Sequence, residues 1–148
     1  MKTPKVLPPH YFFIALACMA AVGYLESGEV LPGWWHLLGL VPAAFGVWSL
    51  AAAARQFSKA DTNIIPLTKS TALVTDGMFS LTRNPMYTGM TAFLIGTAVL
   101  LNGYFAWLVI VPFVLIVRML FIRHEETLME ETFGADYLAY KSTVRRWL

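Results

Sequence analysis

The amino-acid sequence predicts an all-α, polytopic membrane protein: four transmembrane helices with a cytosolic connector and a cytosolic helical tail at the C-terminus. Three observations lead to this fold class, namely the composition, the length of the apolar blocks and the placement of the basic residues. Hydrophobic residues make up 57% of the 148 residues and charged residues only 14%, whereas soluble domains carry roughly 25% charged residues. We therefore expect one membrane-embedded domain over residues 1–148.

Four apolar blocks have about the length that a helix needs to cross a bilayer, which is roughly 20 residues. They predict spans over residues 6–25, 34–54, 85–101 and 104–122. These blocks lack the strict alternation of membrane β-strands, so helices are the expected spanning elements. Residues 55–84 form a polar connector that is too rich in turn formers to cross lipid. The first block continues past Ala15-Leu16-Ala17, which disfavours the alternative of a cleavable signal peptide.

The basic residues predict how the spans are oriented. All 11 lysine and arginine residues lie before the first span, between the second and third spans, or from Arg118 onward. Residues 26–33 and the turn Asn102-Gly103 contain none. Because cytoplasmic loops are enriched in lysine and arginine, we expect both termini in the cytosol and the protein in a bacterial inner membrane.

Small residues recur at helical spacing in the second and third spans. They are Gly39, Ala43 and Gly46 in the second, and Gly89, Ala92 and Gly96 in the third. Small residues at this spacing let helix backbones approach closely in lipid, which predicts a specific interface between the two spans. The alternative is the ordinary composition of membrane helices.

Several familiar kinds of site are absent from the sequence. There is no glycine-rich phosphate-binding motif and no H-E-x-x-H motif. The lone cysteine, Cys18, and three scattered histidines do not match the ligand spacing of a metal site. The net charge of +2 gives no argument for a nucleic-acid partner. We therefore expect neither a metal nor a nucleic acid, and no feature argues for a particular oligomeric state.

One polar cluster, Thr82-Arg83-Asn84-Pro85-Met86-Tyr87-Thr88-Gly89, lies at the start of the third span. Asn84 suits the N-cap of a helix and Pro85 its first position. The positive end of the helix dipole would then lie beside Arg83, which predicts a site for an anion such as a carboxylate. The alternative is a capped helix whose arginine reaches the lipid headgroups.

A second polar cluster follows the fourth span and consists of Arg118, Arg123, His124, Glu125 and Glu126. Helical geometry predicts one shared face for Arg118, Phe121, Ile122, Glu125 and Met129. The helix is expected to continue to Phe133 and to stop at Gly134. The two glutamates predict binding of a cationic ligand, or else they belong to a solvated helix. Arg118 either has a function or extends its side chain to the headgroups.

The C-terminal residues 136–148 alternate aromatic, apolar and basic side chains. Such segments commonly anchor at the membrane interface, which we predict for Arg146 and Trp147. Tyr137 and Tyr140 are instead candidates for a pocket on the cytosolic side.

In this order, the motifs resemble the isoprenylcysteine carboxyl methyltransferase and phospholipid methyltransferase superfamily. The family pattern reads R-H-P-x-Y-x-G, then E-E, then F-G-x-x-Y-x-x-Y. The matching segments are Arg83-Asn84-Pro85-Met86-Tyr87-Thr88-Gly89, Glu125-Glu126, and Phe133 to Tyr140. Asn84 is a departure, because many members have histidine there. The resemblance covers residues 55–148, and the first two spans match only in hydrophobicity.

The resemblance implies an integral membrane methyltransferase that uses S-adenosylmethionine. It implies a catalytic role for Arg118 and Glu125. The implied cofactor-binding residues are Arg83, Asn84, Pro85, Tyr87, Gly89, His124, Glu125, Glu126, Tyr137 and Tyr140. The cofactor carries a carboxylate, an ammonium and a sulfonium, so it needs an anion site and carboxylates close together.

The implied methyl acceptor is a lipid or another apolar molecule with a thiol, carboxylate or lipid-linked group, reached from the surrounding membrane lipids. Two alternatives remain at this point. A nicotinamide-dependent reductase of related membrane fold is one, and a non-catalytic small membrane scaffold protein is the other.

Overall fold

The computed structural model describes residues 6–26 and 28–148, and the regular structure of these residues is entirely helical. Lys2 and Lys5, which contribute to the orientation argument, lie outside the described residues. In chain order the elements are α1 (Pro8–Leu25), the 3-10 helix η1 (Gly33–Gly39), α2 (Leu40–Lys59), the 3-10 helix η2 (Gly77–Ser80), α3 (Pro85–Leu101), α4 (Phe105–Val117), the π-helical η3 (Arg118–Ile122), α5 (Arg123–Phe133) and α6 (Ala135–Thr143).

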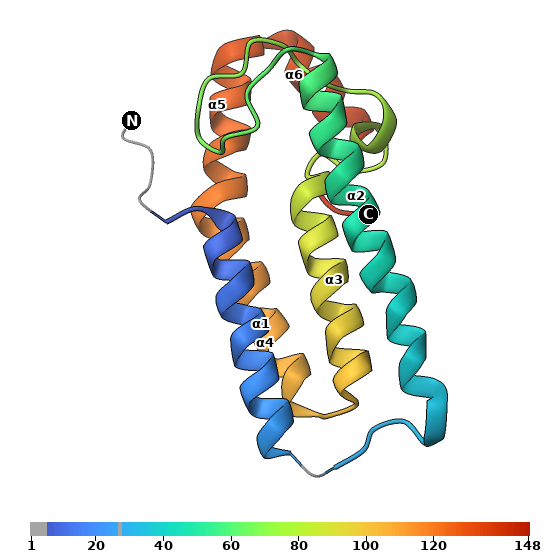
Figure 1. Ribbon diagram of the computed structural model, residues 1–148. Helices are drawn as coiled ribbons and strands as arrows, with labels where there is room; N and C mark the ends of the chain where they lie inside the picture. The colour runs from blue at the N-terminus through green and yellow to red at the C-terminus, as the bar shows by residue number, and fades with distance from the viewer. Residues whose placement is uncertain (1–5, 27) are drawn as a thin grey trace.

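The helices α1 to α4 run side by side as an elongated bundle (Figure 1). Helix α2 packs mainly against α3, and α1 packs mainly against α4. Three continuous helical stretches are long and apolar enough to cross a membrane: α1, η1 with α2 (Gly33–Lys59), and α4 with η3 and α5 (Phe105–Phe133). Helix α3 is a shorter apolar helix of 17 residues that lies among them. The predicted all-helical fold is therefore confirmed for the described residues, whereas the count of four spans stays a prediction because α3 is shorter than the other three stretches.

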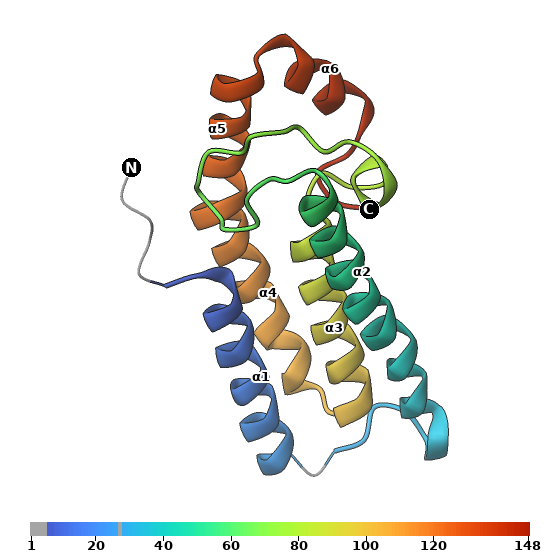
Figure 2. The ribbon, with the colours of Figure 1, turned by 45° about the horizontal axis from the view of Figure 1, so that its top comes forward.

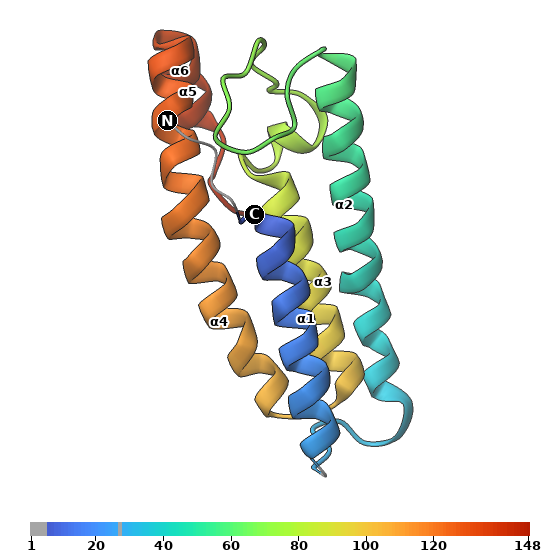
Figure 3. The same ribbon diagram turned by 60° about the vertical axis from the view of Figure 1, so that its left-hand side comes forward.

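The connector, α5 and α6 lie together at one end of the bundle (Figure 2). The start of α1 and the C-terminal tail lie toward that same end, as Figure 3 also shows. Helix α6 turns back at Gly134, whose φ of +52° favours glycine. An ion pair between Lys141 and Glu130 holds α6 on α5. The segments predicted to share the cytosolic side thus share one end, while the side of the membrane stays a prediction.

The opposite end of the bundle is closed by two polar side chains. The Glu26 carboxylate accepts hydrogen bonds from the amides of Tyr104 (2.8 Å) and Phe105 (3.1 Å), which begin α4. Asn102 exchanges hydrogen bonds with the backbone of Leu31 at 2.7 and 2.8 Å. The loop after α1 and the turn before α4 are therefore fastened to each other.

Glycines bring the backbones of α2 and α3 into direct contact. A Cβ added at Gly46 would lie 2.5 Å from the carbonyl oxygen of Gly89, and one added at Gly96 would lie 2.5 Å from that of Gly39. Real Cβ atoms do not approach so closely, so these positions accept glycine alone without movement. The predicted small-residue interface is confirmed.

The π-helical turn η3 changes which side chains of the fourth span face inward. The buried residues on this helix are Ala106, Phe113, Val117, Phe121, Ile122 and Glu126. This stripe advances by one residue at the turn, because a π-helix holds more residues per turn than an α-helix. Arg118 follows the buried Val117, lies off this stripe before the shift, and is exposed. The prediction that Arg118 shares a helix face with Phe121 and Ile122 is wrong, because those two residues are buried and Arg118 is not.

Candidate functional site

A cavity of about 340 Å³ lies at the connector end of the bundle. That volume falls in the range of small-molecule sites, roughly 300–1,000 Å³. Its walls come from the start of α1, the end of α2, the connector, the start of α3, and α5. The polar lining residues are Asn63, Thr68, Ser70, Arg83, Asn84, Tyr87 and Glu125. Most of the remaining lining is apolar and includes Phe57, Met86, Met90, Leu128 and Met129.

Tyr87 and Glu125 meet across the cavity wall and join α3 to α5. The Tyr87 hydroxyl donates a hydrogen bond of 2.7 Å to Oε1 of Glu125. Tyr87 is buried and its ring packs near that of Phe121, with the ring centroids 6.5 Å apart. Within the described residues, no donor reaches the second carboxylate oxygen of Glu125. That oxygen can therefore accept a hydrogen bond from a ligand or pair with a cation.

Glu126, by contrast, is fully engaged within the protein. Its Oε1 accepts hydrogen bonds from Nη2 of Arg83 (3.0 Å) and Nε of Arg146 (2.9 Å), and its Oε2 accepts one from Nη2 of Arg146 (2.6 Å). The side chains of Arg83 and Glu126 are only 9% and 8% exposed. Glu126 is absent from the described lining of the cavity. The structure thus places the two predicted glutamates in different settings.

Arg83 belongs both to this ion triad and to the cavity wall. Its Nη1 donates to the carbonyl oxygens of Lys141 (2.9 Å) and Val144 (2.8 Å). Its Nε is buried and has no hydrogen-bond partner among the described residues. A buried donor left unsatisfied costs about 1–3 kcal/mol. An acceptor supplied by a ligand in the cavity would satisfy it.

Helix α3 begins at Pro85 as predicted, but the side chain of Asn84 does not cap it. Nδ2 of Asn84 instead donates a 3.0 Å hydrogen bond to the carbonyl oxygen of Arg146, and the hydroxyl of Thr82 donates to the same oxygen at 3.0 Å. Asn84 occupies the N-cap position while its side chain holds the C-terminal tail. The predicted side-chain cap is therefore wrong, because the hydrogen bond from Nδ2 to the tail sets the orientation of the Asn84 side chain and its oxygen accepts no bond from the helix.

The tyrosines of α6 lie behind the cavity and are absent from its described lining. The hydroxyl of Tyr140 donates a 2.6 Å hydrogen bond to the carbonyl oxygen of Phe79, and both Tyr137 and Tyr140 are buried. Burial raises the pKa of Tyr137 to about 12, so its hydroxyl stays protonated. In this position the two tyrosines pack α6 against η2.

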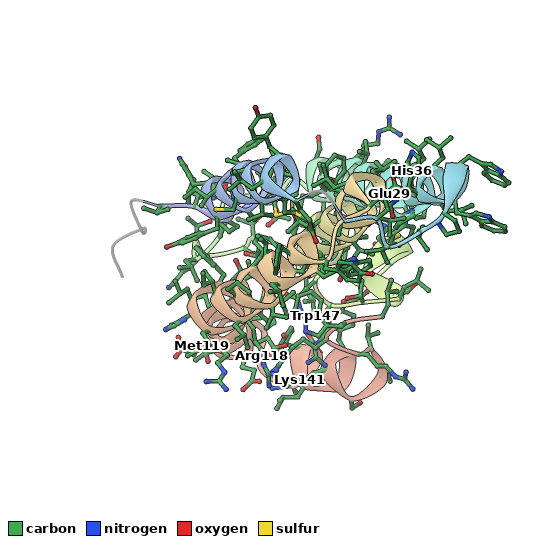
Figure 4. All side chains as sticks on the ribbon, turned by 90° about the horizontal axis from the view of Figure 1, so that it is seen from below. Glu29, His36, Arg118, Met119, Lys141 and Trp147 are labelled. Atoms are coloured by element: carbon green, nitrogen blue, oxygen red, sulfur yellow. The ribbon has the colours of Figure 1, made fainter. Side chains whose placement is uncertain are left out.

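The remaining predicted site residues separate into two groups. Pro85 lines the cavity at the start of α3, whereas Gly89 faces Gly46 in the interface with α2. Arg118 and His124 are exposed, and neither is among the described residues that line the cavity. Arg118 and Met119 lie at the outer edge of the bundle (Figure 4).

Connector residues form a cavity wall that sequence reasoning missed. Asn63 and Thr68 supply polar groups there, and Leu67 has a φ of +59°. The hydroxyl of Thr71 donates to the carbonyl oxygen of Asp61 at 3.0 Å and so closes the base of this loop. The polar pair Thr62-Asn63, which precedes an apolar Ile-Ile-Pro segment, was the only sequence signal for this wall. No local pattern shows which polar side chains of the connector face the cavity.

Comparison with known proteins points to one family. The model of the family described as phospholipid methyltransferase matches residues 34–136. That range runs from η1 into α6 and includes the cavity walls apart from the start of α1.

Two individual relatives were found, and the name of one of them is consistent with this match. Protein-S-isoprenylcysteine O-methyltransferase A of Arabidopsis thaliana is 29% identical over 150 residues, which cover 94% of this chain and 73% of the relative. A protein of Haemophilus influenzae, described only as uncharacterized, is 38% identical over 63 residues, 43% of this chain and the whole of the relative. No solved structure matches the chain.

Proposed function

Because the chain belongs to the phospholipid methyltransferase family, we propose that it is an S-adenosylmethionine-dependent methyltransferase acting on an apolar or lipid-linked acceptor. The observation that carries the proposal is one cavity lined by both Glu125, which keeps a carboxylate oxygen without a donor among the described residues, and Arg83, whose buried Nε has no partner among them. The comparisons support neither a reductase nor a non-catalytic scaffold.

The chemistry of the cavity suits the proposed cofactor. Glu125 offers a negative charge for its cationic groups. Arg83 offers a donor for its carboxylate, next to the first turn of α3, where the amides of Met86 and Tyr87 lack intrahelical partners. Phe57 and Met90 provide apolar contacts for an aromatic base, and methionine sulfur packs well against aromatic rings.

When bound, S-adenosylmethionine supplies an electrophilic methyl group that an acceptor removes by in-line displacement. The protein's own residues contribute orientation and exclusion of water, which can supply much of the rate. The Tyr87 hydroxyl fixes the Glu125 carboxylate at 2.7 Å. A carboxylate acceptor needs no base. A thiol or amine must release a proton, and among the described lining residues Glu125 is the carboxylate that can take it.

Substitution of Glu125 tests the proposal. In the detergent-purified full chain, Glu125→Gln should weaken S-adenosylmethionine binding about ten- to a hundredfold, because it removes a charge-assisted contact that contributes roughly 1.5–3 kcal/mol. Isothermal titration calorimetry measures this change. Glu131→Gln is the matched control, since Glu131 lies on the same helix and is exposed.

Equal dissociation constants for Glu125→Gln and wild type would remove Glu125 from the cofactor site. Titration of the wild type with NADPH separates the alternatives. A reductase would bind NADPH, a scaffold would bind neither ligand, and the proposed methyltransferase binds S-adenosylmethionine alone.

A further inference from the structure

A second hollow, of about 360 Å³, lies on the outer side of α2 at the connector end. Its lining residues are Trp48, Ala52, Arg55, Gln56 and Lys59 of α2, and Gly77, Met78 and Leu81 from η2 and the residue after it. It is separate from the cofactor cavity, because Phe57 and Phe79, which line that cavity, are the chain neighbours of Gln56 and Met78 and pack edge-to-face with their ring centroids 5.0 Å apart. We call this hollow the α2 groove.

The α2 groove is held in shape by the Gln56 side chain. Its Nε2 donates a 2.8 Å hydrogen bond to the carbonyl oxygen of Asp76, and its Oε1 accepts one of 3.3 Å from the amide of Met78. These two bonds fasten η2 to the last turns of α2. The groove is therefore built by the fold and does not depend on a ligand for its walls.

The chemistry of the α2 groove changes along the axis of α2. Trp48 and Leu81, each 55% exposed, give its deeper part an apolar surface. Arg55 and Lys59 follow toward the connector end, and both are exposed. Arg55 directly follows the predicted span 34–54, so the cations lie where lipid headgroups begin. At 1.5 Å per residue, Trp48 lies about 10 Å deeper than Arg55.

In the part of the chain that the structure describes, the two cations form no ion pair. Among the described residues, neither Arg55 nor Lys59 has a carboxylate within 4.0 Å, and no acidic residue lines the α2 groove. Asp76 lies on the adjoining surface, where it lines a neighbouring hollow together with Lys59. Among the described residues, the groove is thus lined by two cations and no acidic side chain, and only Lys59 also lines the hollow that contains Asp76.

From this arrangement we propose that the α2 groove binds an anionic phospholipid of the surrounding membrane, with the phosphate at Arg55 and Lys59 and an acyl chain along Trp48 and Leu81. Basic pockets at the cytoplasmic ends of membrane helices bind anionic headgroups in this manner. The apolar surface in the deeper part of the groove, formed by Trp48 and Leu81, favours binding of a lipid over free phosphate. The bound lipid is distinct from the methyl acceptor, because the aromatic contact of Phe57 and Phe79 separates the groove from the cavity.

The test is lipid binding to the detergent-purified full chain by native mass spectrometry, with phosphatidylglycerol and phosphatidylcholine of identical acyl chains. Wild type should retain phosphatidylglycerol preferentially. Arg55→Gln combined with Lys59→Gln should reduce phosphatidylglycerol retention by about fivefold for each charge removed and leave phosphatidylcholine unchanged. Trp48→Ala should reduce retention of both lipids, and Arg55→Lys should keep the preference.

The matched control is Arg123→Gln combined with Arg145→Gln, which removes two exposed cations at the same end of the bundle but outside the groove. This control should keep the preference. Equal loss in both double variants would show that retention follows overall charge, and no loss in the first would show that Arg55 and Lys59 do not hold the lipid; either result overturns the site. Binding of glycerol 3-phosphate as tight as that of the lipid overturns the choice of ligand.

Discussion

The neighbouring residues Glu125 and Glu126 have unlike environments, although they are adjacent in the sequence. Glu125 lines the cavity and accepts a single hydrogen bond, from Tyr87. Glu126 accepts three hydrogen bonds from two arginines. Adjacent residues on a helix differ in direction by about 100°, so one glutamate can face a ligand while the other binds the tail.

Arg83 joins these two environments, and its substitution should therefore have two effects. Arg83→Ala removes the donor proposed for the cofactor carboxylate and also takes one partner from Glu126. We expect weaker binding of S-adenosylhomocysteine, the demethylated product, and a smaller change for its decarboxylated form. We also expect a lower melting temperature, since breaking a buried ion pair costs about 3–5 kcal/mol.

Calorimetric titration of the folded variant with both ligands measures the first effect. An equal loss for the two ligands would show that Arg83 does not recognise the carboxylate. Asn84→His, the residue common in the family, should keep binding of the product only if a histidine side chain can also hold the tail carbonyl of Arg146.

At the scale of elements, the C-terminal tail and the start of α3 form one unit. Residues 82–84 donate hydrogen bonds to the tail through the Thr82 hydroxyl, the Arg83 amide and side chain, and the Asn84 side chain. Trp147 packs against the main apolar core. The tail therefore fixes the wall of the cavity at which the third span begins, in contrast to the predicted role of a plain interfacial anchor.

Arg146 and its neighbour Arg145 provide a matched test of this unit. Arg146→Ala should lower the free energy of unfolding by about 1.5–3 kcal/mol, because it removes charged hydrogen bonds to Glu126. Arg145→Ala should have little effect, since its side chain is exposed and only its backbone contacts Arg83. Thermal unfolding of the purified variants compares the two. Equal melting temperatures for the two variants would show that the hydrogen bonds between Arg146 and Glu126 do not stabilise the fold.

Sequence patterns were sufficient to predict the helices but only part of the site. The apolar blocks, Pro85 and Gly134 gave the main helix boundaries, because these signals are local. The buried stripe of the fourth span shifts from Phe121 to Ile122 and Glu126 at a single π-helical turn, which periodicity over so short a segment does not reveal. The partners of Glu126 come from residues 43 positions before it and 20 after it, so only the tertiary fold could separate its role from that of Glu125.

At the scale of the whole molecule, the connector, α5, α6 and the tail gather at one end, and the short loops gather at the other. We predict that the first end faces the cytosol, because all the basic residues lie there or outside the described residues.

Cysteine labelling in intact cells tests this orientation. With Cys18 replaced by alanine, single cysteines at Glu29 and at Leu148 should react from opposite sides of the membrane. A membrane-impermeant maleimide should modify position 29 alone. Modification of both positions from outside would rule out the three crossings that the four-span prediction places between them.

The glycine contacts between α2 and α3 also have a consequence for motion. Backbones that touch have no intervening layer of side chains that could slide or change rotamer, so α2 and α3 should behave as one rigid body. The cavity's other walls come from the connector, the start of α1 and α5. Of these three, only α1 and α5 belong to helical stretches that are long and apolar enough to cross a membrane. Admission of a bulky acceptor from the bilayer should therefore proceed by displacement of α1 relative to α5. Hydrogen exchange should be slowest in α2 and α3, and uniform exchange across all four helices would contradict this division.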